Sequence, residues 1–203
     1  MRMAATCRIW GTDDQQGSRV LRLPHPTSEL PKRERLLRSV DFAADGSISA
    51  ADSDGSIWLW CVDNLTEPVA IRGDLLSVGH VRYCGNDQLL ATCLRENSVN
   101  LLDLSADNRL LWTQTFDFAP ECLAVSTDNR LVAVATKGID IYLLNRHSGE
   151  RIGTLRGHSE TVRCISFLPN LDELVSTGSD GAICLWDIAS GTLIRTFTIV
   201  SAL

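Results

Sequence analysis

One short pattern recurs along the whole chain at an almost constant interval, and this recurrence restricts the folds that the chain can adopt. The first set of apolar segments ends at positions 41, 42 and 42 residues apart, namely Phe42, Tyr83, Val125 and Phe167. The second set ends at steps of 50, 42, 40 and 44 residues, at Trp10, Trp60, Leu102, Tyr142 and Trp186. Two independent markers that share one period predict an array of similar structural units.

Each unit has the pattern of a small antiparallel sheet. In the segment 182–186, Ile183 and Leu185 face one way while Cys184 and Trp186 face the other, which is typical of a strand buried on both faces. Gly, Asn and Asp fill the turns between successive apolar segments. A fourth and more charged segment closes each unit and suits an outer edge. Because no segment shows a convincing 3.6-residue period, the sequence predicts an all-β fold of four-stranded antiparallel sheets.

Composition limits the function classes. The 203 residues are 44% apolar and 22% charged, which is typical of a globular chain with a sizeable core. No apolar run approaches the roughly 20 residues of a membrane span, and the N-terminus lacks the apolar core of a secretory signal. We therefore expect a cytoplasmic or nuclear protein without a membrane partner. The net charge of −6 disfavours direct binding of nucleic acid, which needs a basic face.

The seven cysteines are scattered singly in apolar segments, without a C-x-x-C pair. This usage predicts small buried side chains in a reducing compartment. The glycines fall at turns rather than in a phosphate-binding loop, and no pair of histidines has metal-ligand spacing. We expect no cofactor, no metal site and no catalytic residue.

The last repeat, LRGHSETVRCISFLPNLDELVSTGSDGAICLWDIASGTLIRTF, has Gly157-His158 near its start and Trp186-Asp187 near its end. With the period of about 42 residues, this repeat resembles those of the WD-repeat β-propeller family. The resemblance covers essentially the whole chain, although the earlier repeats are degenerate. In these repeats Gly73-Asp74 stands in the place of Gly-His, and Leu102-Asp103 and Tyr142-Leu143 stand in the place of Trp-Asp.

The resemblance implies an incomplete propeller of four four-stranded antiparallel blades plus a half blade at the N-terminus. The expected parts of this single domain, residues 1–203, are a half blade (1–23), a Pro/basic loop (24–35), blades at 36–72, 73–116, 117–155 and 156–198, and a truncated tail (199–203). Both ends fall in mid-pattern, so we expect a fragment or isoform of a longer propeller. Otherwise self-association or a partner that completes the ring would have to cover the exposed apolar faces.

In this family the Trp of the third strand joins a Ser, a His and an Asp through hydrogen bonds. The resemblance assigns this structural network to Trp186, Ser176, His158 and Asp180, and only the last repeat has the complete set. A Ser, a His and an Asp could also form a hydrolase triad. Because Ser176 lies within a predicted strand rather than on a strained turn, we favour the structural interpretation.

Two features are candidate partner-binding sites. The loop LPHPTSELPKRERLL, residues 23–37, contains Lys32, Arg33 and Arg35 and could dock an acidic partner; the alternative is a solvated insertion. Trp112, in a strand expected at the outer edge, is a second candidate anchor, and the alternative is that it covers the core.

These observations predict a non-enzymatic scaffold for protein–protein interactions in a multiprotein complex, since propellers of this family usually hold proteins together. One alternative is a propeller subunit that supports an RNA- or chromatin-associated enzyme complex. The other is a propeller enzyme, which would need carboxylates or histidines converging on the central channel.

Overall fold

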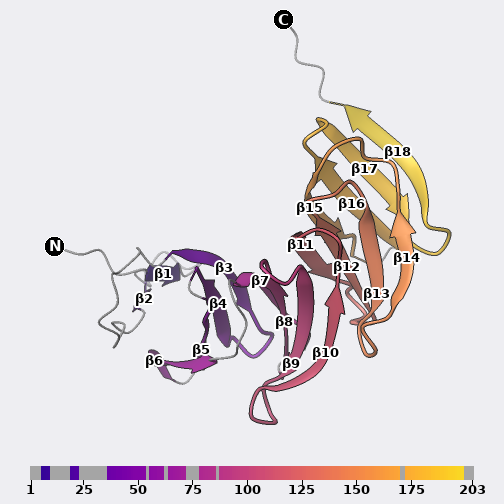
Figure 1. Cartoon of the computed structure of the whole chain (residues 1–203). Helices are drawn as coiled ribbons and strands as arrows, with labels where there is room; N and C mark the ends of the chain where they lie inside the picture. Colours follow the sequence, from indigo (N-terminus) through magenta and orange to yellow (C-terminus); the bar gives the residue numbers. More distant parts are fainter. Residues whose placement is uncertain are drawn as a thin grey trace, which may run out of the picture.

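The computed structural model describes residues 6–9, 19–22, 36–53, 55–61, 64–71, 78–85, 87–169 and 172–198. All regular secondary structure in these residues consists of β-strands, so the predicted all-β class is confirmed. The strands form one two-stranded sheet and four four-stranded antiparallel sheets, which follow one another along an arc (Figure 1). We call the four-stranded sheets blades 1 to 4 in chain order.

The two-stranded sheet pairs β1 (Thr6–Ile9) with β2 (Arg19–Arg22). Blade 1 consists of β3 (Leu37–Phe42), β4 (Ile48–Asp52), β5 (Ile57–Cys61) and β6 (Asn64–Ile71). Blade 2 consists of β7 (Val78–Tyr83), β8 (Gln88–Cys93), β9 (Ser98–Asp103) and β10 (Arg109–Thr115). Blade 3 consists of β11 (Pro120–Val125), β12 (Leu131–Thr136), β13 (Ile141–Asn145) and β14 (Arg151–Leu155). Blade 4 consists of β15 (Val162–Phe167), β16 (Glu173–Gly178), β17 (Ala182–Asp187) and β18 (Thr192–Thr198).

The first strands of successive blades lie beside one another on the concave side of the arc (Figure 1). They end at the positions that the sequence predicts, Phe42, Tyr83, Val125 and Phe167. The fourth strand of each blade is its outer edge, and β18 is exposed along its whole length. The second strands of blades 1 to 3, β4, β8 and β12, are the most buried, because neighbouring sheets cover both of their faces.

One predicted register is wrong. In blade 4, Trp186 pairs with Leu174, and the same position in blade 3 pairs Leu144 with Val132. Leu144 and Asn145 therefore occupy the places of the motif Trp and Asp, not Tyr142 and Leu143. The segment IDIY looks like the start of a strand, but the turn between β12 and β13 takes up its first two residues. With this correction the third-strand marker recurs at 42, 42 and 42 residues, at Trp60, Leu102, Leu144 and Trp186.

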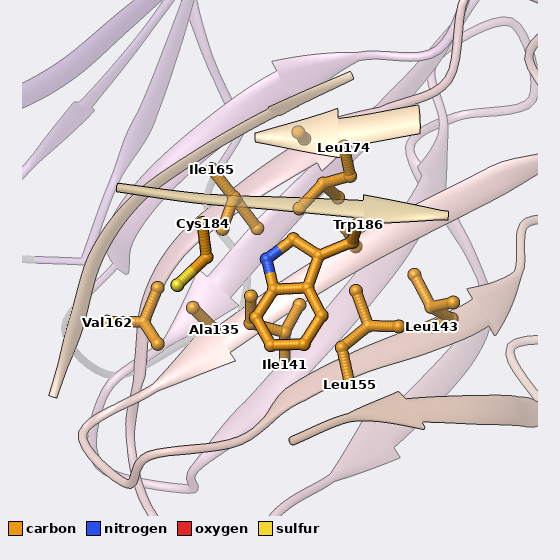
Figure 2. Packing of buried hydrophobic residues seen from close by; sticks show 11 residues of the cluster. Ala135, Ile141, Leu143, Leu155, Val162, Ile165, Leu174, Cys184 and Trp186 are labelled. Carbon is orange, nitrogen blue, oxygen red and sulfur yellow. The ribbon is translucent and has the colours of Figure 1, made fainter. Parts of the chain in front are cut away.

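The core lies between the blades rather than inside one of them. Between blades 3 and 4, the fully buried indole of Trp186 packs among small and branched side chains of both sheets (Figure 2). Ala133 and Ala135 on β12 leave the room that this large ring needs. Blades 1 to 3 thus pack one face against the preceding sheet and the other face against the following one, while the second face of blade 4 is only partly buried.

The ends of the strands form two faces of the arc. The face that we call the connection face carries the links between successive blades, such as residues 116–119 and 156–161. It also carries the turns between second and third strands, such as residues 137–140 and 179–181. These loops hold most of the residues discussed below.

Candidate functional site

A chain of hydrogen bonds crosses blade 4 from its core to the connection face. The indole Nε1 of Trp186 on β17 donates to the Oγ of Ser176 on β16, over 2.7 Å. The same Oγ lies 2.7 Å from Nε2 of His158, and Nδ1 of His158 lies 2.9 Å from Oδ2 of Asp180. The structure therefore brings together the four residues that the family resemblance assigns to a network.

The direction of two of these hydrogen bonds follows from what each group can do. The indole N–H only donates and the Asp180 carboxylate only accepts, so Trp186 donates to the Ser176 hydroxyl and the imidazole Nδ1–H donates to Asp180. The His158 side chain is fully buried, and every polar atom in the chain from Trp186 to Asp180 has a partner.

Asp180 fixes the loop at the end of this chain. It also accepts hydrogen bonds from the backbone N–H groups of Ser159 and Ala182, at 2.9 and 3.0 Å. Burial raises the pKa of the Asp180 carboxyl, but these bonds and the one from His158 outweigh it and lower the pKa to about 2. The carboxylate thus ties the connection 156–161 to the turn before β17.

Gly178 makes room for the hydrogen bond between His158 and Asp180, and sequence reasoning missed it. A Cβ at this position would lie 2.6 Å from both Asp180 Oδ1 and His158 Nδ1, closer than real Cβ contacts. The Gly-Ser-Asp-Gly turn is visible in the sequence, but the close approach of a residue 20 positions earlier is not.

The geometry disfavours the hydrolase interpretation of this trio. Ser176 is fully buried in the middle of β16, with its hydroxyl between His158 and Trp186. A nucleophile must reach the reacting atom of a substrate, and this oxygen faces only the core. The network therefore acts on structure: it holds two loops of the connection face in place.

The corresponding tryptophan of blade 1 has no such partner. Trp60 occupies the place of Trp186, and Ala50 stands where blade 4 has Ser176. The indole nitrogen of Trp60 is buried without a hydrogen bond. A second tryptophan of this blade, Trp58, donates its Nε1–H to Asp52 at 2.8 Å.

Blade 2 has a different polar network, which the sequence analysis did not identify. The buried amide of Asn100 donates to Cys93 Sγ at 3.0 Å and to Ser98 Oγ at 3.3 Å, and accepts from Thr113 Oγ1 at 2.6 Å. Burial raises the pKa of the Cys93 thiol to about 11, so this cysteine stays protonated and inert. An Asn inside an apolar strand was the signal that could have revealed the network.

The predicted partner-binding residues differ in what the structure says about them. Lys32, Arg33 and Arg35 lie outside the described residues. Trp112 is half-buried on β10: its Nε1 donates to the carbonyl of Arg146 at 2.8 Å, and a Cβ at Gly149 would lie 2.6 Å from its ring. This placement supports the second interpretation of Trp112, in which it covers the core between blades 2 and 3.

The connection face also exposes two large apolar side chains that sequence reasoning missed. Phe118 precedes β11 and is 53% exposed, and Ile139 lies in the β12–β13 turn and is 49% exposed. Their only signal in the sequence was a bulky apolar residue in a predicted loop. Elsewhere in the described ranges, no three His, Cys, Asp or Glu side chains are grouped to hold a metal ion. A helix long and apolar enough to cross a membrane is likewise absent from these ranges.

Comparison with known families and proteins agrees with this architecture. Residues 149–187 match the family described as WD domain, G-beta repeat. The chain is 35% identical over 112 residues to the uncharacterized WD repeat-containing protein sll1491 of Synechocystis sp., a match that covers 53% of this chain and 31% of the relative. It is 28% identical over 181 residues to the transcription factor unc-37 of Caenorhabditis elegans, covering 81% of this chain and 29% of the relative.

Among solved structures, a chain of the mitotic checkpoint complex superposes with a TM-score of 0.81 at 20% sequence identity. The match covers 96% of this chain and 60% of that chain, and at this identity it shows a shared fold. The present chain therefore spans about three tenths of the length of the two curated relatives and three fifths of the structural match.

Proposed function

Because this chain belongs to the WD40-repeat β-propeller family, we propose that it is a non-enzymatic scaffold that holds other proteins together in a multiprotein complex. Propellers of this family typically serve as interaction scaffolds. The observation that carries the proposal is the use of the Trp186 network: its Ser, His and Asp shape the connection face instead of presenting a nucleophile. Loops held on a rigid sheet scaffold are where recognition residues accumulate.

The relatives support an assembly role rather than one process. One is named a transcription factor, and the structural match comes from a mitotic checkpoint complex. What these proteins share with the present chain is the propeller. Only the second name is that of a protein assembly, and it is a role inside an assembly, cytoplasmic or nuclear, that we propose for this chain.

Within this role, Lys32, Arg33 and Arg35 are the proposed docking residues for an acidic partner segment. Their cluster in a Pro-containing loop and the acidic balance of the rest of the chain set this segment apart. A solvated insertion is the competing explanation.

Affinity purification with quantitative mass spectrometry tests both levels of the proposal. The chain should retain a defined set of proteins in stoichiometric amounts, and a charge reversal of Lys32, Arg33 and Arg35 should lose a subset of them. A control reversal of Arg109 and Arg130, which are exposed on the face opposite the connection face, should lose none of that subset. If the loop reversal changes no partner, the docking residues are wrong; if the unaltered chain retains no protein, the scaffold role is wrong.

A further inference from the structure

Phe118 and Ile139 come from two adjacent loops of the connection face. A Cβ built on Gly138 would lie 3.1 Å from the ring of Phe118, so the ring rests against the residue that precedes Ile139. Phe118 and Ile139 are each about half exposed. We take these two side chains as the apolar centre of the adjacent loops 116–119 and 137–140.

Hydrogen bonds hold the loops around this centre in fixed positions. The backbone N–H of Lys137 donates to the carbonyl of Ala119, which joins the two loops that carry Phe118 and Ile139. On one side, the Asn97 side chain of blade 2 donates to the carbonyl of Asp117 at 3.2 Å. On the other side, Thr161 of blade 4 donates to the carbonyl of Lys137, also at 3.2 Å. The apolar centre is therefore presented by pre-ordered loops, which lowers the entropic cost of binding.

These contacts place the backbone of an acidic residue and that of a basic residue on opposite sides of the centre. Asp117 lies toward blade 2 and Lys137 lies toward blade 4, and both side chains are exposed. Across the described ranges of the chain, neither of them forms an ion pair. We call the set of Asp117, Phe118, Lys137 and Ile139 the Phe118 patch.

We propose that the Phe118 patch is a contact between two copies of this chain, related by a two-fold axis through its apolar centre. In such a contact each copy uses the same surface, so every contact between two different residues occurs twice, once in each direction. An axis that lies in the plane of the contact, perpendicular to the line from Asp117 to Lys137, places Lys137 of one copy opposite Asp117 of the second copy, twice per dimer. Phe118 and Ile139 then bury against their counterparts, with the charges as a polar rim.

The charge arrangement selects a second copy over other occupants. A basic segment of another protein would match Asp117 but face Lys137, and an acidic segment would do the reverse. A second copy satisfies both charges with the same residues. This pairing is independent of the scaffold role and does not involve the loop that carries Lys32, Arg33 and Arg35.

The contact should be weak and reversible. Two half-exposed apolar side chains are a small centre compared with the roughly 800 Å² that each partner buries in a standard interface. The polar loops around them add area but little apolar burial. We expect a dissociation constant on the order of 10–100 µM.

Sedimentation equilibrium of the 203-residue chain, up to several hundred micromolar, tests the contact. We expect a monomer–dimer equilibrium that Lys137→Glu and Asp117→Lys each weaken at least about tenfold, because each change creates two like-charge pairs. The double variant that carries both changes should restore the dimer. Phe118→Ser should abolish it, and Arg130→Glu on the opposite face should leave it unchanged.

Thermal unfolding of each variant, monitored by circular dichroism, controls for loss of structure. A chain that stays monomeric throughout the concentration range overturns the proposal. So does an association that the single charge reversals leave intact, since the contact would then lie elsewhere, for example on the outer blade that ends with the exposed β18. Failure of the double variant to regain the dimer would also overturn it.

Discussion

Replacement of Ser176 by Ala is the most direct test of the network in blade 4. The change removes one oxygen from a fully buried site and leaves almost no cavity, so its cost is electrostatic. It leaves two buried groups without a partner, the Nε1–H of Trp186 and the Nε2 of His158. An unsatisfied buried polar group costs about 1–3 kcal/mol.

The two losses are coupled because both groups bonded the same oxygen, so they do not add fully. We expect Ser176→Ala to lower the free energy of unfolding by about 2–4 kcal/mol. Urea unfolding, monitored by tryptophan fluorescence, measures this loss. Ser190→Ala, in an exposed turn of the same blade, is the matched control. Ser190→Ala should lower the free energy of unfolding by about 0.5 kcal/mol or less, well below the loss at Ser176.

Hydrogen exchange locates the effect. Amides of blade 4 and of the connection 156–161 should lose protection in Ser176→Ala, while those of blade 1 should keep theirs, because each blade contacts mainly its neighbours. A cost below about 0.5 kcal/mol would refute the assignment of the network as a brace. Uniform loss of protection over all blades would refute its local action.

Three further predictions concern the same structural position and its loop. Ala50→Ser should stabilise blade 1 by about 1 kcal/mol or less, because it offers an acceptor to the unsatisfied indole of Trp60; urea unfolding that shows a loss instead would contradict this. Gly178→Ala should destabilise blade 4 and loosen the connection 156–161 in hydrogen exchange, because its Cβ would collide with Asp180 and His158; an unchanged exchange pattern would count against it. Since the pKa of Asp180 is lowered to about 2 from 3.8, its contribution to stability is full above pH 3.8 and is lost as the pH falls toward 2. The free energy of unfolding, measured against pH, should therefore fall between pH 3.8 and 2 in the unaltered chain. Asp180→Asn should lose this contribution, while the exposed-turn variant Asp107→Asn keeps it.

The period alone was enough to predict the number and kind of the described sheets. The ends of all four first strands followed from apolar segments and turn residues, because a strand buried on both faces leaves a plain signal. The error in blade 3 arose because Ile139 is apolar but lies in a turn. Local pattern could not decide whether that residue begins a strand, since the answer depends on the register with β12.

The candidate site was predictable only where a motif linked its residues. His158 and Asp180 are 22 positions apart, and the last repeat alone preserved the spacing that identifies them. Contacts between blades left no comparable signal. The bond from Thr161 to Lys137 and the packing of Phe118 on Gly138 depend on which loops become neighbours after folding, so the Phe118 patch emerged only from the structure.

One position of the third strand shows why a single repeat matches the family while all four form blades. The residue two before the Trp186 position recurs at 42-residue intervals, as Trp58, Asn100, Tyr142 and Cys184. Its surroundings differ from blade to blade: Trp58 donates to a carboxylate in blade 1, Asn100 bonds hydroxyl and thiol groups in blade 2, and an arginine lies over the ring of Tyr142 in blade 3. What the blades share is an apolar sheet face of the right volume, with partners for most of the buried polar groups; the indole nitrogen of Trp60 is an exception. The Trp-Ser-His-Asp chain is one solution among several, so the motif can be lost from a blade whose backbone is kept.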